Sequence, residues 1–237
     1  MHADVVAMHI SNGIIGVPVS ALAAVLAAAV LAICLVKARA DLDDRLAPMA
    51  GLVAAFIFAV QMLNFPVLPG VSGHLLGGAL AVMLVGPWVG SLCVALVLTV
   101  QALLFADGGL TALGLNILNM GIVGTFVAYG LVVVLLKVVP RTNAGIVTTA
   151  WIVSVISVVV ASQAFVLEYA LGGTTSISLT TISGTMAGFH FLIGAGEAVI
   201  TAITVGTVAK VRPDLVYALR GRQQSLVIAT PITDRAA

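Results

Sequence analysis

Charged residues are scarce in this chain, and their scarcity excludes most classes of soluble protein. Of 237 residues, 10 are lysine or arginine and 9 are aspartate or glutamate, so that 8% are charged while 61% are hydrophobic. Soluble domains have roughly a quarter of their residues charged. No basic patch is interleaved with aromatic residues, which argues against nucleic acid as a partner. The composition indicates an all-α polytopic membrane protein.

Cysteine is rare as well. Cys34 and Cys93 both lie in apolar runs, where a free thiol behaves as a small hydrophobic group, so neither a disulfide framework nor a thiolate metal site is expected. The first seven residues contain no lysine or arginine and therefore lack the charged start of a secretory signal peptide. The run Ile14–Val36 is too long for a signal-peptide core and predicts a retained transmembrane helix.

Seven apolar segments follow one another along the chain. A spanning helix needs about 20 apolar residues, and two of the segments are shorter than this. The predicted spans are Ile14–Val36, Pro48–Leu63, His74–Val85, Trp88–Phe105, Leu113–Val139, Ala144–Glu168 and Met186–Val208.

The basic residues indicate how these spans are oriented. All ten lie in three connections, within 37–45, 137–141 and 210–235, and the alternate connections contain none. Because basic residues concentrate on the cytoplasmic side, about seven transmembrane helices with the N-terminus outside and the C-terminus cytoplasmic fit best. A single span across Gly86-Pro87 would move Lys137 and Arg141 outside, so we expect a tight cytoplasmic turn there. The predicted organisation is an external segment 1–13, a seven-helix domain 14–209 and a cytoplasmic tail 210–237.

Two of the four histidines come to the same membrane face in this topology. His9 precedes the first span, and His74 stands at the external end of the third. Asp107 and Glu168 fall on or near that face as well. Imidazole suits nickel, cobalt, copper and zinc alike, so the pair predicts a transition-metal site without choosing the metal.

The residues around His9 offer a specific chelate. If translation starts at Met8, the free amine, the next amide nitrogen and the His9 ring can bind one cation, and His74 can complete a square plane of four nitrogens. That geometry suits Ni(II) or Cu(II), whereas zinc prefers a tetrahedron and magnesium prefers oxygen ligands. Met1-His2 offers the same chemistry, but Met8 leads directly into the first helix.

Polar side chains inside the predicted spans are few, and each can serve packing or function. Asn116 and Asn119 share a helical face, where they can bond neighbouring helices or orient a ligand-bearing loop. His190 and Glu197 lie two turns apart on the last helix, where they can form a structural network or bind a ligand directly. The alanine-rich part of the first helix is either an internal packing seam or a docking face for another membrane subunit. The amide side chains of Gln61, Gln101 and Gln163 also lie within the predicted spans.

Several segments resemble the CbiM/NikM family, the substrate-binding membrane subunits of energy-coupling-factor cobalt and nickel importers. The resemblance covers nearly the whole chain. It is carried by Met8–Ile15, Asn64–Gly78, Gly86–Trp88, Gln101–Leu110, Leu113–Gly121 and His190–Ala198. Many relatives have aspartate where this chain has Asn12, which weakens any direct ligand role for that residue.

The resemblance implies a multi-pass protein of the inner (plasma) membrane that binds Co²⁺ or Ni²⁺ as a transported substrate, without a permanent cofactor. The implied ligands are Met8, His9 and His74. We expect a supporting site or network formed by Ser72, Asn116, Asn119, His190 and Glu197. The implied partners are a transmembrane coupling subunit, two cytoplasmic ATPase subunits and a small accessory membrane subunit. The chain itself has no Gly-rich phosphate-binding loop, so it is expected to be a transporter subunit and not an enzyme.

Two alternatives come from other classes of protein. A haem oxidoreductase would place paired histidines on facing helices, whereas His9 precedes the first span and His190 has no obvious mate. A proton-coupled secondary metal transporter would use Glu197 and His190, but such folds commonly contain repeated halves, and no convincing internal repeat is found here. The sequence does not distinguish cobalt from nickel.

Overall fold

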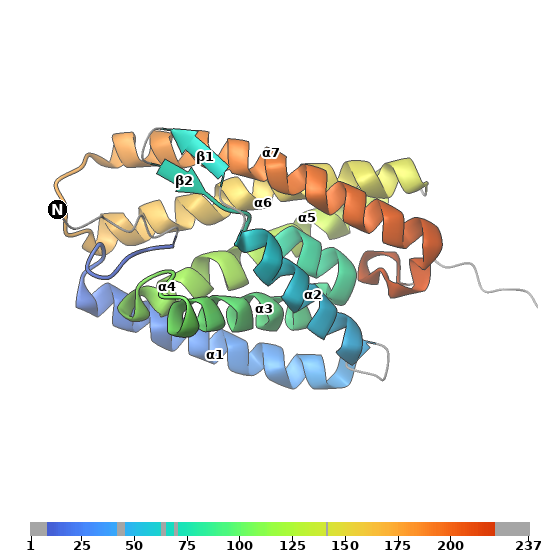
Figure 1. Ribbon diagram of the computed structural model, residues 1–237, viewed down its shortest axis with the longest axis horizontal. Helices are drawn as coiled ribbons and strands as arrows, with labels where there is room; N and C mark the ends of the chain where they lie inside the picture. Colours follow the sequence, from blue (N-terminus) through green and yellow to red (C-terminus); the bar gives the residue numbers. More distant parts are fainter. Residues whose placement is uncertain (1–8, 42–45, 63–64, 69–70, 141, 221–237) are drawn as a thin grey trace, which may run out of the picture.

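The computed structural model describes residues 9–41, 46–62, 65–68, 71–140 and 142–220 (Figure 1). Within these ranges the chain is almost entirely helical. The helices are α1 (Val17–Asp41), α2 (Leu46–Gln61), α3 (Gly78–Leu104), α4 (Leu113–Asn116), α5 (Thr125–Val138), α6 (Asn143–Gly172) and α7 (Leu179–Val211). The strands are β1 (Phe65–Leu68) and β2 (Val71–Gly73).

Five helical segments in the described part of the chain are long and apolar enough to cross a membrane: Val17–Ala40, Gly78–Leu104, Leu110–Val138, Asn143–Gly172 and Leu179–Val211. The third of these is continuous through α4, a π-helical stretch at Ile117–Gly124 and α5. The apolar helix α2 has 16 residues and so is about 24 Å long, shorter than the roughly 30 Å hydrocarbon layer. Apart from the short β-hairpin, the architecture is that of a helical polytopic membrane protein.

Helix α3 is interrupted at Gly86. This residue has φ 83° and ψ 173°, outside the helical region, and Pro87 follows it. A Cβ built on Gly90 would lie 3.1 Å from the Cβ of Ala81, although nine residues of straight helix rise about 13.5 Å. The chain therefore turns back on itself at Gly86, and Figure 1 shows the two arms side by side. A sharp turn at Gly86-Pro87 is what the sequence predicts.

The third predicted span needs a correction at its start. Helix begins only at Gly78, and the four residues from His74 to Gly77 are buried in a non-helical conformation. Gly77 has φ 81°, and a Cβ there would lie 2.8 Å from the side chain of Ile57. The sequence pattern missed this because His74, Leu75 and Leu76 continue the apolar run without a visible break.

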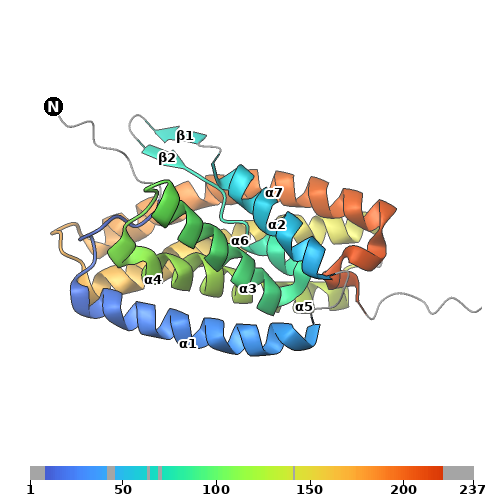
Figure 2. The same ribbon diagram turned by 60° about the horizontal axis from the view of Figure 1, so that its bottom comes forward.

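A short antiparallel hairpin precedes this segment. Strand β1 pairs with β2 through Phe65–Gly73, Pro66–Ser72 and Leu68–Val71, in the connection between the second and third predicted spans. Ser72 is part of β2, and His74 directly follows that strand. The hairpin lies beside α7 in both views (Figures 1 and 2).

The core is built around α3, whose residues are mostly buried, with α1 on the outside of the bundle. On α1, Ala23, Ala27 and Cys34 are buried along one face, whereas Leu22 and Val25 are exposed. The alanines at four-residue spacing thus form an internal packing seam. The opposite face of α1 is apolar and suited to lipid or to another membrane protein.

The described part of the predicted cytoplasmic tail packs against the bundle. Two short 3₁₀ turns at Pro213–Leu215 and Tyr217–Leu219 follow α7, and Val216 between them is fully buried. A Cβ on Gly86 would lie 2.6 Å from the ring of Tyr217. Residues 213–220 therefore pack against the turn at Gly86 in α3, whereas 221–237 lie outside the described residues.

Candidate metal site

The rings of His9 and His74, 65 residues apart in sequence, meet in the structure. Their centroids are 4.4 Å apart with an interplanar angle of 45°. Both residues are buried, at 6% and 5% exposure. His9 stands just before α1, and His74 stands between β2 and α3, so one ligand-type side chain comes from each of two non-helical segments.

Asp107 completes this group. Its Oδ1 lies 3.0 Å from Nδ1 of His9, and both ring nitrogens of His9 are buried without a hydrogen bond of acceptable geometry within the described residues. Carboxylates beside a ligand imidazole commonly orient the ring and select its tautomer. The predicted topology puts Asp107 on or near the face of the two histidines, and the structure brings its carboxylate to His9.

The loop after α3 is shaped to bring Asp107 to His9. Ala106 has φ 52° and Gly108 has φ 88°, both in the left-handed region. A Cβ on Gly108 would lie 2.8 Å from the Cβ of His9. Glycine is therefore required at Gly108 both for its backbone conformation and for the close approach of the N-terminal segment.

Asn116 holds the backbone next to His9. Its Oδ1 accepts a 3.0 Å hydrogen bond from the amide of Ile10, and its Nδ2 donates to the carbonyl of Ile10 at 3.4 Å. Gly109 N also donates to that carbonyl at 3.0 Å. Asn116 thus orients the segment that contains His9, the second of the two roles considered from the sequence. Nearby, Oδ1 of Asn12 accepts hydrogen bonds from Thr111, which is a structural role.

Asn119 has the other role. Its Nδ2 donates to Oε2 of Glu168 at 2.7 Å and so joins the π-helical segment to α6. Within the described residues, its side chain forms no hydrogen bond with either histidine segment. Two asparagines at three-residue spacing therefore serve different purposes, and the sequence alone did not separate them.

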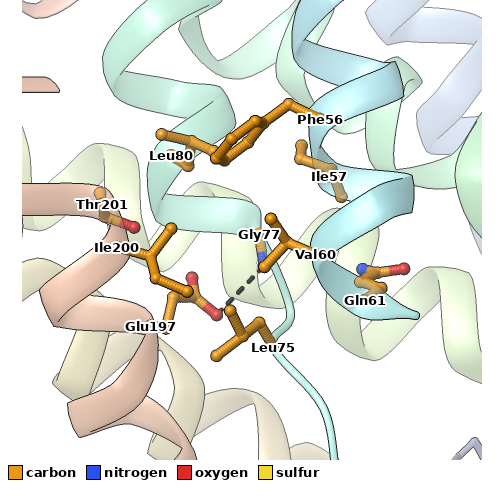
Figure 3. Close-up of a pocket in the computed structure, with 10 residues that line it drawn as sticks. All are labelled: Phe56, Ile57, Val60, Gln61, Leu75, Gly77, Leu80, Glu197, Ile200 and Thr201. Carbon is orange, nitrogen blue, oxygen red and sulfur yellow. Dashed lines mark hydrogen bonds between the residues drawn. The ribbon is translucent and has the colours of Figure 1, made fainter. Parts of the chain in front are cut away.

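Glu197 and Gln61 hold the segment that follows His74. Oε2 of Glu197 accepts hydrogen bonds from Leu76 N at 2.7 Å and from Gly77 N at 3.1 Å. Nε2 of Gln61 donates to the carbonyl of Leu76 at 2.8 Å. Figure 3 shows the two side chains on either side of this backbone, at a cavity of about 10 Å³, roughly the room of one water molecule. Non-helical backbone inside a bundle needs such partners, because lipid offers none.

His190 is not part of either group. Its Nδ1 lies 2.9 Å from the carbonyl of Met186, one turn earlier on α7, and no hydrogen bond joins it to Glu197 within the described residues. The network considered from the sequence is therefore not formed between these two side chains. Met8 lies outside the described residues, and Ser72 is described only through its backbone pairing in β2.

Two imidazoles and one carboxylate do not by themselves form a closed coordination shell. In the described ranges no group of three or more His, Cys, Asp or Glu side chains is arranged to hold a metal ion. Any cation bound between His9 and His74 therefore needs donors of another kind, and backbone nitrogens next to His9 are the nearest by sequence.

Comparison with known proteins places this geometry in a family. The family model CbiM, described as the cobalt uptake substrate-specific transmembrane region, matches residues 9–215. A provisionally named fused nickel transport protein, NikMN, from Archaeoglobus fulgidus is 38% identical over 227 residues, covering 95% of this chain and 74% of that protein. The cobalt transport protein CbiM of Sorangium cellulosum is 30% identical, covering 90% of this chain and 96% of that protein.

Solved structures give the same result for the fold. A crystal structure described as a truncated transition metal transporter superimposes with a TM-score of 0.77 at 29% sequence identity, covering 86% of this chain and 99% of that one. A second transition metal transporter structure superimposes with a TM-score of 0.77 at 30% identity.

Proposed function

The chain belongs to the CbiM family of transmembrane proteins of cobalt uptake, and on this basis we propose that it is the substrate-binding subunit of an importer for Co²⁺ or Ni²⁺. It is a multi-pass membrane protein and a transporter subunit, not an enzyme. The cation is captured between His9 and His74 and is a substrate that passes through the system.

The observation that carries this proposal is the meeting of two buried imidazoles from distant segments. The ring centroids lie 4.4 Å apart. Asn116 holds the segment of His9 through Ile10, and Glu197 holds the segment of His74 through Leu76. Supporting side chains of this kind hold ligands ready for the cation and so reduce the cost of ordering them on binding.

The remaining donors come from the main chain. With a start at Met8, the terminal amine and the His9 amide nitrogen join the two rings in a square plane, which favours nickel or cobalt over magnesium. Nδ1 of His9 lies 3.0 Å from Oδ1 of Asp107. To bind the cation, Nδ1 must therefore give up its contact with Asp107. Asp107 then supplies a negative charge beside the bound cation.

The chain crosses the membrane seven times if α2 is counted as a span and the two arms of α3, before and after Gly86, are counted as separate spans. The segment from His74 to Val85 leads from the histidine site to Gly86, and the arm from Pro87 to Leu104 returns to Asp107. Gly86, Lys137 and the turns after α7 then lie at the basic end of the bundle, supported by the contact of Tyr217 with Gly86. The positive-inside rule makes this end cytoplasmic and the histidine end external.

Energy for import comes from partners. These partners are the ones that the family resemblance implies: a transmembrane coupling subunit, two cytoplasmic ATPase subunits and a small accessory membrane subunit. The absence of a phosphate-binding loop in this chain is consistent with ATP hydrolysis on a separate subunit. The exposed apolar face of α1 is a suitable surface for a membrane partner. Release of the cation follows a change in the orientation of this subunit that the partners drive.

Metal affinity of the purified protein tests the site. Titration calorimetry with Ni²⁺ and with Co²⁺ is carried out on the chain starting at Met8, on the chain starting at Met1, and on His9→Ala and His74→Ala variants of the former. Tight binding that is lost in both variants and weakened by the longer start supports the proposed ligands. Equal binding by all four proteins would exclude this site.

A further inference from the structure

A hollow of about 510 Å³ lies at the basic end of the bundle, between α5 and the turns that follow α7. Its volume falls within the roughly 300–1,000 Å³ of typical small-molecule sites. The wall is apolar, and the rim has two cationic side chains. The lining includes Tyr129, Val132, Leu136, Lys137, Tyr217 and Arg220. None of the lining residues in the described part of the chain is acidic.

The two cations at the rim are available to an anion. Neither Lys137 nor Arg220 forms an ion pair with a carboxylate in the described ranges, and the guanidinium of Arg220 lies 5.0 Å from the centre of the Tyr217 ring. Arg212, by contrast, is already paired with Asp214 at 2.7 Å. The positive charge of the hollow therefore comes from Lys137 and Arg220.

The wall of the hollow joins the surface that faces lipid. Val132 and Leu136 are buried on α5, and their neighbours Val133 and Val134 are 38% and 59% exposed on the same helix. Lys137 stands one residue before the end of α5. Apolar wall and cationic rim thus follow one another where a spanning helix reaches the membrane surface, which is the arrangement that an anionic lipid requires.

We propose that this hollow binds an anionic glycerophospholipid, with its phosphate between Lys137 and Arg220 and an acyl chain along α5. Basic pockets between transmembrane helices at the cytoplasmic surface are suited to anionic head groups. An acidic protein segment would satisfy the charges, but it would not explain why the apolar wall continues into the lipid-facing surface of α5.

The lipid would fix the two turns that follow α7. Tyr217 lines the hollow and also packs against Gly86, where α3 reverses. A phosphate bound to Arg220, three residues later, therefore holds the terminal turns against that reversal. This lipid site lies at the basic end of the bundle, and the proposal does not depend on the position of the cation site.

Spin-labelled lipids test this proposal in the full chain. The protein is placed in phosphatidylcholine nanodiscs, and the immobilised fraction of spin-labelled phosphatidylglycerol is compared with that of spin-labelled phosphatidylcholine. Lys137→Gln/Arg220→Gln removes both cations, Lys137→Arg/Arg220→Lys keeps them, and Lys37→Gln/Lys210→Gln is a matched control with the same loss of charge outside the hollow. The hollow variant is expected to bind phosphatidylglycerol about 25-fold more weakly, about fivefold for each cation.

The other two double variants are expected to bind phosphatidylglycerol as the parent does. An equal loss in the control would mean general attraction to the surface and would overturn the site. Displacement of the labelled lipid by millimolar inorganic phosphate would identify a phosphate site instead of a lipid site. Unchanged lipid binding in the hollow variant, together with lost assembly with the partner subunits, would assign the hollow to a protein.

Discussion

Replacing Glu197 should weaken metal binding although this side chain touches no proposed ligand. Its carboxylate accepts hydrogen bonds from Leu76 and Gly77, two and three residues after His74. Glu197→Ala leaves two buried N–H groups without an acceptor, at about 1–3 kcal/mol each, so about 2–6 kcal/mol of stability is lost. Glu197→Gln keeps an oxygen that can accept both bonds and loses only the advantage of charge, about 1–1.5 kcal/mol for each bond.

The effect on metal affinity follows from the freedom that His74 gains. Loss of side chains that support a metal ligand typically costs 10–100-fold in affinity. We expect about this loss for Glu197→Ala and a smaller one for Glu197→Gln, measured by Ni²⁺ titration calorimetry on monodisperse protein. The absorption bands of bound Ni²⁺ should also shift, since they report the geometry of the ligands.

Glu168→Ala is the matched control for this prediction. Glu168 is also a buried carboxylate on a spanning helix, but its partner is Asn119. It should lower the thermal midpoint without changing metal affinity. If Glu197→Ala bound Ni²⁺ within twofold of the parent, with unchanged absorption bands, the argument that this side chain positions His74 would be refuted.

Three further predictions concern the segment of His9. Asn116→Ala removes both bonds to Ile10 and should weaken Ni²⁺ binding about tenfold; unchanged affinity would mean that the segment is held by other contacts. Gly108→Ala places a Cβ against His9 at positive φ, so it should cost about 1–3 kcal/mol in thermal unfolding, whereas Gly130→Ala, with open space around it, should not. Asp107→Asn should weaken binding about tenfold in calorimetry; tighter binding would show that displacing the carboxylate from Nδ1 of His9 costs more than its attraction to the cation contributes.

The sequence predicted the helices and the histidine pair from two simple regularities. Apolar runs of spanning length located the helices, and the alternation of basic connections indicated that Gly86-Pro87 is a turn, which agrees with the reversal at Gly86. The same alternation placed His9 and His74 at one end of the bundle, where their rings meet. Both regularities depend on the membrane, which constrains length and charge more strongly than water does.

The contacts that hold the site were not accessible in this way. Asn116 and Asn119 differ only in their partners, one in the segment of Ile10 and the other on α6. The start of α3 at Gly78 depends on Glu197, whose hydrogen bonds to Leu76 and Gly77 cross 121 and 120 residues. Local patterns contain no information on such distant partners, and this is why the predicted third span began too early.

That separation along the chain also has a consequence for biosynthesis. At about 5–20 residues per second, the ribosome reaches Glu197 roughly 6–24 seconds after Gly77. Until α7 enters the membrane, the backbone from His74 to Gly77 has no carboxylate to bond, and the arm from Gly78 to Val85 is too short to cross the bilayer by itself. The support for the backbone after His74 is therefore completed only when α7 has been made, and a chain that ends before α7 would reach the membrane without it.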